Sequence, residues 1–171
     1  MNKVKDVSEI FKSCFNLTNL KLWNLHNNSI ADMSYMFYNM SKLQLLDLSN
    51  FNTTGVTKMD RMFAACEILM SISFGPYFDT SLVTSFAYMF GGCNLIGVYG
   101  LFDLRCFKTT KVTNMVGMFQ ECWNIIYIDL SSFDTSSVLH FDNMFLGCSE
   151  LISLNLYFNT SKAITMMHMF D

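Results

Sequence analysis

Apolar residues recur in a fixed order along this chain, and the spacing is clearest in the segment that begins at Ile30. Ile30, Met33, Met36, Phe37 and Met40 follow one another at steps of three, three, one and three. Such steps place side chains on a single face of an α-helix. The pattern therefore predicts a short amphipathic helix, and the same spacing returns in every later segment.

A second apolar pattern comes directly after each predicted helix. Leu43, Leu46 and Leu48 form L-x-x-L-x-L, whose second half alternates as a strand with one buried face does. An Asx–Thr pair usually follows, and short side chains of this kind favour turns. We expect these pairs to stack into a polar ladder. They are Asn52-Thr53, Asp79-Thr80, Asp134-Thr135 and Asn159-Thr160.

The two patterns repeat together with a nearly constant period. Subtracting the numbers of neighbouring aligned phenylalanines gives steps of 26, 26, 27, 29, 26 and 25. Periods of about 20 to 50 residues are typical of solenoids and other repeat arrays. The aligned phenylalanines are Phe11, Phe37, Phe63, Phe90, Phe119, Phe145 and Phe170. We expect the five middle ones, from Phe37 to Phe145, to form one interior row.

L-x-x-L-x-L once per repeat is the leucine-rich-repeat pattern. We therefore predict an α/β leucine-rich-repeat solenoid, with one short parallel strand and one short helix per coil of about 26 residues. A globular α/β domain is the alternative. The fourth unit is irregular, because residues 102–106 look inserted. A single array is expected over residues 1–171, with units that start near Val4, Ile30, Val56, Val83, Val112, Val138 and Ile164.

One phrase of the repeat resembles that of the BspA-like surface proteins. It is Leu46-Asp47-Leu48-Ser49-Asn50-Phe51-Asn52-Thr53, and residues 128–138 repeat it closely. The resemblance implies a leucine-rich-repeat adhesin at the cell surface or secreted. The sequence shows no signal-peptide pattern, no lipidation cysteine near its start and no obvious capping unit. We therefore expect either a location other than the surface or a fragment of a longer array, and in both cases an array without caps.

The composition narrows the classes of partner. Of the 171 residues, 51% are hydrophobic and 15% are charged, and the formal net charge is −3. A negative chain has no basic field to attract nucleic acid, so we expect none as a partner. The longest apolar runs are far shorter than the ~20 residues that cross a bilayer. We therefore expect no transmembrane segment.

Five of the six cysteines share one repeat position, where the second unit has Met40. A cysteine that alternates with methionine is best explained as a small buried hydrophobe, and we expect free thiols. Cys106 lies outside the column, so we expect it to be the accessible one. The cysteines do not show the C-x-x-C spacing that would indicate a structural zinc site. The column consists of Cys14, Cys66, Cys93, Cys122 and Cys148.

Residues with catalytic chemistry do not converge in the repeat. His26, His140 and His168 share no column, and Asp47 and Asp129 lie three units apart. At about 4.8 Å per coil, these two carboxylates would stand about 14 Å apart, too far to act together. No glycine-rich phosphate loop is present. We therefore predict a non-enzymatic protein without cofactor or metal.

Binding is predicted for the strand positions that point away from the core. Repeat proteins bind partners on such extended concave faces, and aromatic residues dominate binding hot spots. The leading hypothesis is a protein-binding, adhesion-type module for a protein or host-surface ligand, and the alternative is an intracellular structural scaffold. The candidate binding residues are Trp23, Asp47, Phe102, Tyr127, Asp129 and Tyr157.

Overall fold

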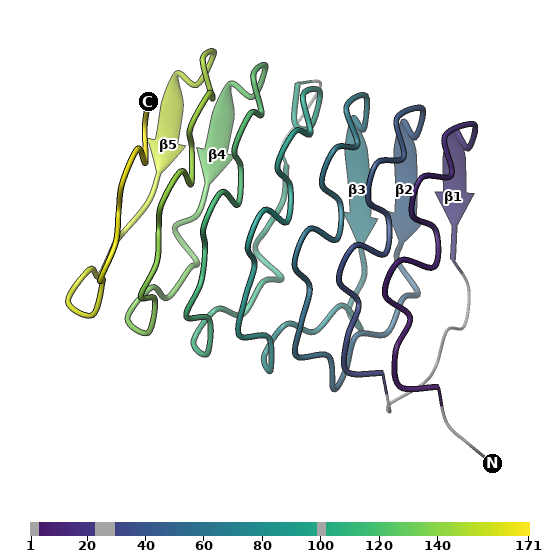
Figure 1. The fold of residues 1–171 in the computed structure, drawn as a ribbon, viewed down its shortest axis with the longest axis horizontal. Helices are drawn as coiled ribbons and strands as arrows, with labels where there is room; N and C mark the ends of the chain where they lie inside the picture. Colours follow the sequence, from purple (N-terminus) through teal and green to yellow (C-terminus); the bar gives the residue numbers. More distant parts are fainter. Residues whose placement is uncertain (1–3, 23–29, 99–101) are drawn as a thin grey trace.

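The computed structural model describes residues 4–22, 30–98 and 102–171. Figure 1 shows coils that stand side by side in a row, with the N-terminus at one end and the C-terminus at the other. Each coil crosses between two walls. The strands lie in the farther wall of this view, and segments without strands form the nearer wall.

The strands are short, parallel and in register. β1 (Asn19–Lys21), β2 (Leu45–Leu48) and β3 (Ser71–Phe74) form one sheet, and β4 (Tyr127–Asp129) pairs with β5 (Ser153–Asn155) in a second. Leu20, Leu46 and Ile72 are direct neighbours in the register. The L-x-x-L-x-L pattern thus predicted the strands correctly where they form, because alternate side chains face the core.

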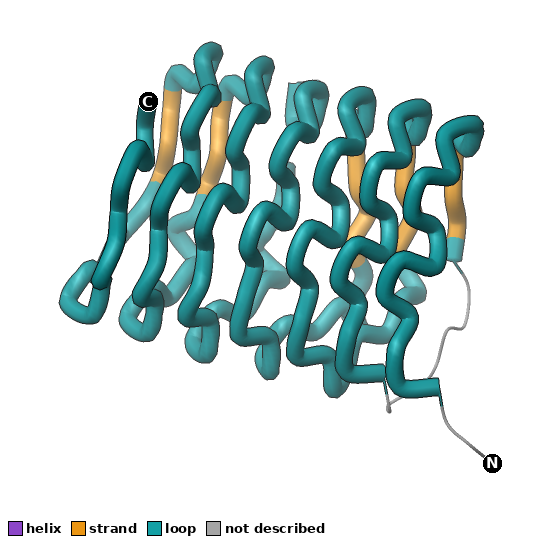
Figure 2. Tube along the Cα trace, viewed as in Figure 1, coloured by secondary structure: helices purple, strands orange, loops and turns teal. Residues whose placement is uncertain are grey.

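No helix occurs among the described residues, so the predicted helix in each coil is wrong (Figure 2). The predicted α/β leucine-rich-repeat fold is wrong with it. The segments with helical spacing are residues 6–14, 32–40, 58–66, 85–93, 114–122, 140–148 and 165–171, named the turn segments below. Each is a run of consecutive tight turns.

The third coil shows how a run of turns produces a helix-like pattern. The amides of Met62, Ala64 and Cys66 donate to carbonyls three residues back, which closes turns. The alternate amides, including those of Arg61 and Ala65, donate instead to the next coil, at N–O distances of 2.7–3.0 Å. An α-helix would direct every amide to the fourth residue back. Turns closed by hydrogen bonds between residues three apart still bring Met59, Met62, Phe63 and Cys66 to the core side, where each is fully buried.

Positive φ angles mark the same difference from a helix. Arg61 and Ala65 have φ angles of 54° and 58°, and the corresponding positions of other coils are also positive. A helix has φ near −63° throughout. The left-handed residues rotate alternate peptides outward, so that their amides and carbonyls reach the neighbouring coil. A parallel ladder of single bridges runs along this wall: Asp6–Asp32–Lys58–Ser85–Asn114–His140–Thr165.

The aligned phenylalanines stand in one row, and its five middle members form the predicted interior row. Their rings stack face to face from coil to coil, with centroids 5.3–5.7 Å apart and planes within 10° of parallel. Every ring from Phe37 to Phe145 is buried. The stacked rings join each coil to the next through the core, as the hydrogen bonds between coils do in the walls. The row is therefore confirmed, although the segments that carry it are not helical.

The predicted polar ladder is also confirmed. The hydroxyls of Thr53, Thr80, Thr109 and Thr135 are buried and donate to carbonyls of the next coil at 2.7–3.2 Å. The fourth coil has Lys108 in place of the Asx residue. Its ammonium pairs with the Asp79 carboxylate of the preceding coil at 3.1 Å.

The fourth coil has no strand among its described residues, and its insertion fills the core. Phe102, Leu104 and Phe107 are buried, and the Phe102 ring meets Phe90 edge to face at 4.9 Å. Phe102 was predicted on the outer face, and that prediction is wrong. Three extra residues beyond the usual period of 26 let this segment turn large side chains inward, where they replace the packing of a regular strand.

Ala65→Gly distinguishes the observed turns from a helix. In an exposed helix this change costs about 1 kcal/mol. Here Ala65 has a positive φ, which disfavours any residue with a Cβ by about 1–2 kcal/mol, so the change should leave the free energy of unfolding unaltered or raise it by up to about 1 kcal/mol. Urea unfolding measures the difference. Ala64→Gly is the matched control and should destabilise; equal losses in both variants would contradict the turn assignment.

Met118→Asp should unfold the stack. Met118 has no exposed surface, so the variant buries a carboxylate without a partner, at a cost of about 4 kcal/mol or more. Circular dichroism during urea titration reports the loss. Met167→Asp, at a side chain that is 64% exposed, should leave the signal nearly unchanged. A folded, stable Met118→Asp protein would show that the core side is misassigned.

Candidate functional site

The predicted binding residues of the strand wall are only partly brought together. Tyr127 and Asp129 project outward from β4, and Tyr157 is 74% exposed just beyond β5. Asp47 lies on β2, in the other sheet. Phe102 is in the core, and Trp23 lies outside the described residues. The outward surface of β1–β5 is called the sheet face below.

Charges on the sheet face are satisfied by neighbours within the chain. The Lys21 ammonium lies 2.8 Å from Asp47 and, together with hydrogen bonds from Ser49, holds the Asp47 pKa below its usual range. A hollow of about 190 Å³ beside Tyr127 and Asp129 also contains an ion pair, Arg105 with Asp103 at 2.6 Å. The sheet face therefore offers exposed aromatic rings but few unsatisfied polar groups.

The opposite wall carries a larger hollow that the sequence analysis missed. The outward surface of the turn segments, called the turn face below, has a depression of about 610 Å³ over the first five coils. Most of its lining comes from two columns. One is the ladder of bridged residues, and the other is the positive-φ column, which includes Glu9, Tyr35, Arg61 and Tyr88.

Arg61 is held between two tyrosine rings at this hollow. Its Nη1 donates a 3.0 Å hydrogen bond to the Tyr35 hydroxyl of the preceding coil. Its guanidinium carbon lies 4.3 Å from the Tyr88 ring centroid and 5.6 Å from that of Tyr35. These contacts orient a flexible side chain, because a guanidinium is attracted to the faces of aromatic rings.

Glycine provides the space that the Tyr88 ring occupies. A Cβ built at Gly117, the same repeat position on the next coil, would lie 2.4 Å from a Tyr88 ring carbon. A side chain at position 117 would have to displace the Tyr88 ring. The ring consequently lies over the backbone of the fifth coil and closes one side of the Arg61 clamp.

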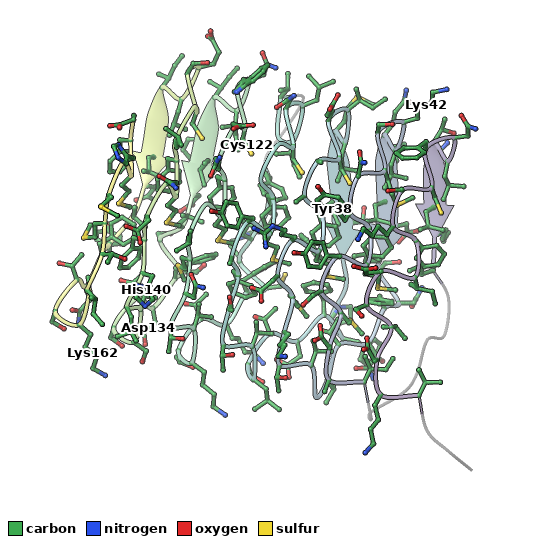
Figure 3. The ribbon with its side chains drawn as sticks, in the orientation of Figure 1. Tyr38, Lys42, Cys122, Asp134, His140 and Lys162 are labelled. Carbon is green, nitrogen blue, oxygen red and sulfur yellow. The ribbon has the colours of Figure 1, made fainter. Side chains whose placement is uncertain are left out.

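A second cation and a second tyrosine extend the cluster toward the first coil. Tyr38 meets Tyr35 edge to face, with ring centroids 5.4 Å apart. The Lys12 ammonium lies 5.3 Å from the Tyr35 centroid and 5.7 Å from the Tyr38 centroid. Lys12 also forms a 2.8 Å ion pair with Glu9, and this contact raises the Lys12 pKa. Figure 3 labels Tyr38, on the second coil.

Arg61 differs from its charged neighbours in lacking a carboxylate partner. Lys58 pairs with Asp32 at 3.6 Å. Asp60 accepts hydrogen bonds from the Ser85 hydroxyl and from the Ala87 amide. Among the residues that the structure describes, no carboxylate oxygen lies within 4.0 Å of the Arg61 guanidinium. Four of its five N–H donors remain available beyond the Tyr35 contact.

A smaller hollow of about 190 Å³ adjoins the clamp on its other side. Small residues in two adjacent coils, Ala64-Ala65 and Gly91-Gly92, leave it open, and Arg61, Tyr38 and Tyr88 border it. Gln120 lies at its far edge. The Oε1 atom of Gln120 is buried and has no hydrogen-bond partner, while its Nε2 donates to Glu121 at 3.2 Å. An acceptor without a partner is costly unless something supplies a donor.

The turn-face residues were visible in the sequence as a column. Tyr35, Arg61 and Tyr88 stand one period apart, at steps of 26 and 27. The predicted helices placed them on a solvated surface, and only the strand columns were considered for binding. Counting aromatic and cationic residues two positions before each Phe of the core row would have found them.

Three members of the cysteine column, Cys66, Cys93 and Cys122, are buried as predicted, whereas Cys148 is half-buried, and all six cysteines are free. The thiols of Cys66, Cys93 and Cys122 donate to phenylalanine carbonyls of the preceding coil at 3.0–3.1 Å. Burial raises the pKa of Cys66 to about 12. Cys14 is exposed and Cys106 is half-buried, so Cys106 was wrongly predicted to be the accessible thiol.

One histidine belongs to a hydrogen-bonded chain that joins two coils. His140 Nδ1 lies 2.9 Å from the Thr165 hydroxyl, which in turn donates to the Asp142 carboxylate. Asp142 also accepts the Met167 amide at 2.9 Å. The chain fastens the last described coil to its neighbour. Among the described residues, no three His, Cys, Asp or Glu side chains gather as metal ligands would.

A comparison with protein families gives one result. The sequence profile described as "Mycoplasma protein of unknown function, DUF285" matches residues 1–98 and again residues 97–171. The chain belongs to this family. The two adjoining matches agree with the repetition seen in the coils. Membership in DUF285 does not confirm the narrower BspA-like leucine-rich-repeat assignment.

Neither curated proteins nor solved structures give a match to this DUF285 chain. Within residues 4–22, 30–98 and 102–171, no helix has the length and apolar character needed to cross a membrane.

Thiol reactivity should follow burial. At pH 8 a thiol whose pKa is raised stays protonated, and the protonated form does not attack disulfide reagents. Cys14 should react within seconds with Ellman's reagent, whereas Cys66, Cys93 and Cys122 should react only after unfolding. Mass spectrometry of labelled peptides identifies each site. Rapid labelling of Cys93 in the native protein would contradict its burial.

Proposed function

We propose that this protein is a non-enzymatic binding module that uses its turn face. The observation that carries the proposal is the Arg61 guanidinium, which two tyrosine rings hold at the border of both hollows without a carboxylate partner. Holding an arginine in one position costs conformational entropy. A ligand that completes its hydrogen bonds would recover that cost.

The polar contacts of the chain favour binding over catalysis. Asp60, Asp47 and Asp142 each accept hydrogen bonds from the backbone or from a hydroxyl, so their oxygens already have partners within the chain. The buried thiols have raised pKa values and lie against carbonyls. General acid–base or nucleophilic catalysis needs a group poised to exchange a proton at a cleft. The Arg61 cluster instead provides fixed donors and ring faces.

The competing hypothesis is a structural scaffold whose surfaces bind no specific ligand. The Thr ladder, the Phe row and the inter-coil hydrogen bonds would serve either role. The two hypotheses differ at Arg61, Tyr35 and Tyr88. A scaffold requires only that these side chains be soluble and compatible with the fold, whereas a binding module requires their particular chemistry.

Binding should depend on the turn face and not on the sheet face. Wild-type protein is screened on arrays of immobilised oligosaccharides and peptides, beside Arg61→Gln and Tyr88→Leu. We expect discrete ligands, and a loss of at least tenfold in affinity for them in both variants. Arg105→Gln is the matched control, because Arg105 is an exposed arginine on the other wall.

The scaffold hypothesis would be supported by a different outcome. It predicts that the wild-type protein retains no ligand above background, or that Arg61→Gln and Arg105→Gln lose binding equally. Equal melting temperatures for all variants would show that a loss of binding comes from the altered surface side chain and not from unfolding. Binding that is lost only in Tyr127→Ala, a variant that should fold normally, would place the interface on the sheet face instead.

A further inference from the structure

We infer that the ligand of the Arg61 site is a sugar acid: a hydroxylated ring that carries one carboxylate. The inference rests on the proposed function and names the chemical class of its ligand. Three features of the turn face support it, namely the unpaired guanidinium, the acidic groups around it, and the tyrosine faces beside a small hollow.

The guanidinium selects an oxygen anion. Arg61 uses one N–H for the Tyr35 hydroxyl, and its remaining donors form a planar fork. A fork of this kind matches a carboxylate, sulfate or phosphate, and a bidentate pair is both stronger and more directional than a single contact. Tyr35 and Tyr88 fix the plane of the fork, so the carboxylate can approach only along the border of the two hollows.

Neighbouring carboxylates restrict the charge of that anion. Glu9 and Asp60 line the larger hollow, and Glu121 lines the smaller one. Lys58 and Lys12 are each already paired with an acid. A phosphate dianion or a polyanionic chain would meet repulsion from these acids, and among the described residues that line the two hollows only Arg61 is a cation without an acidic partner to balance it. A single carboxylate is therefore favoured over phosphate, sulfated glycans or nucleic acid.

The rest of the site suits a body rich in hydroxyl groups. The Glu121 carboxylate is exposed, and the buried Oε1 atom of Gln120 beside it is an acceptor without a donor that a ligand hydroxyl would reach after rotation of the Gln120 side chain. Acceptors of this kind bind O–H groups. The ring of Tyr38 at the hollow supplies an apolar surface against which the C–H side of a sugar ring packs, and the edge of the Tyr88 ring borders the same space. The Ala64-Ala65 and Gly91-Gly92 backbones let a compact ring approach closely.

These features assign a role to each residue. Arg61 would bind the carboxylate, Tyr88 would hold Arg61 in place, Tyr38 would pack against the sugar ring, and Gln120 would accept a hydroxyl donor. An aspartate side chain or a peptide C-terminus also offers a carboxylate, but it lacks the cluster of hydroxyl donors that Gln120 and Glu121 would accept. The peptide carboxylate is therefore the ligand that the experiment must distinguish.

The test is an NMR titration of the whole chain with defined probes. Spectra of the backbone amides and of the arginine Nε–H groups are recorded with D-glucuronate, D-glucose, acetate, N-acetyl-aspartyl amide and inorganic phosphate. We expect glucuronate to shift the Arg61 Nε–H resonance and the amides of the smaller hollow. Glucose, which has the ring without the carboxylate, and acetate, which has the carboxylate without the ring, should each bind at least tenfold more weakly.

Three variants separate the contributions. Arg61→Gln should abolish the glucuronate shifts. Arg61→Lys keeps the charge but loses the fork, so affinity should fall about tenfold. Gln120→Leu should weaken glucuronate while leaving acetate unchanged, because acetate has no hydroxyl for that acceptor. Arg105→Gln, on the sheet face, should match the wild type, and equal melting temperatures show that all the variants fold.

Several results would overturn the inference. Acetyl-aspartyl amide or acetate binding as tightly as glucuronate would indicate a peptide carboxylate site, and phosphate binding more tightly would indicate a phosphate site. Glucose binding equally would remove the role of Arg61. If an array ligand depends on Arg61 but glucuronate causes no shift, the proposed binding function stands and its assignment to sugar acids fails.

Discussion

Hydrogen bonds between neighbouring coils are the constraint on which this structure depends. In the turn segments, alternate amides close tight turns within a coil and the others reach the next coil. Residues such as Arg61 and Ala65 must adopt a left-handed conformation for this to occur. Buried backbone groups have to be paired, and here the pairing runs along the row of coils instead of around a helix axis. A coil without neighbours would leave those groups unsatisfied.

The repeat period of the side chains predicted which residues form the columns of the core. It could not predict the backbone of the turn segments, because a helix and a run of tight turns place apolar side chains at the same spacing. The Phe row, the buried cysteine column and the Thr ladder follow from residues that recur about every 26 positions. The spacing of Met59, Met62, Phe63 and Cys66 fits a helix as well as it fits a run of turns that are closed by hydrogen bonds between residues three apart. Only backbone φ angles distinguish the two structures. Glycine at 92 and 147, where other coils have Ala65 and Glu121, was the available hint.

The site was harder to predict than the core because it arises between coils. Arg61 contacts Tyr35 on one side and Tyr88 on the other, and Gly117 leaves room for the second ring. None of these residues forms a motif within its own repeat. Of the predicted residues, Tyr127, Asp129, Asp47 and Tyr157 lie outside the core, as expected. Phe102 does not, because the longer fourth coil turns it inward.

The left-handed column that carries Arg61 has a wider consequence. Its position is occupied by Glu9, Tyr35, Arg61, Tyr88, Gly117, Asn143 and His168 in successive coils. The backbone conformation there is fixed by the partner coils, while the outward side chain is acidic, aromatic, basic, absent or amide-bearing. One scaffold can thus exchange its recognition surface residue by residue without altering its interior. Duplicating or swapping a coil would rewrite the order of these side chains, so new specificities can arise by recombination of repeats.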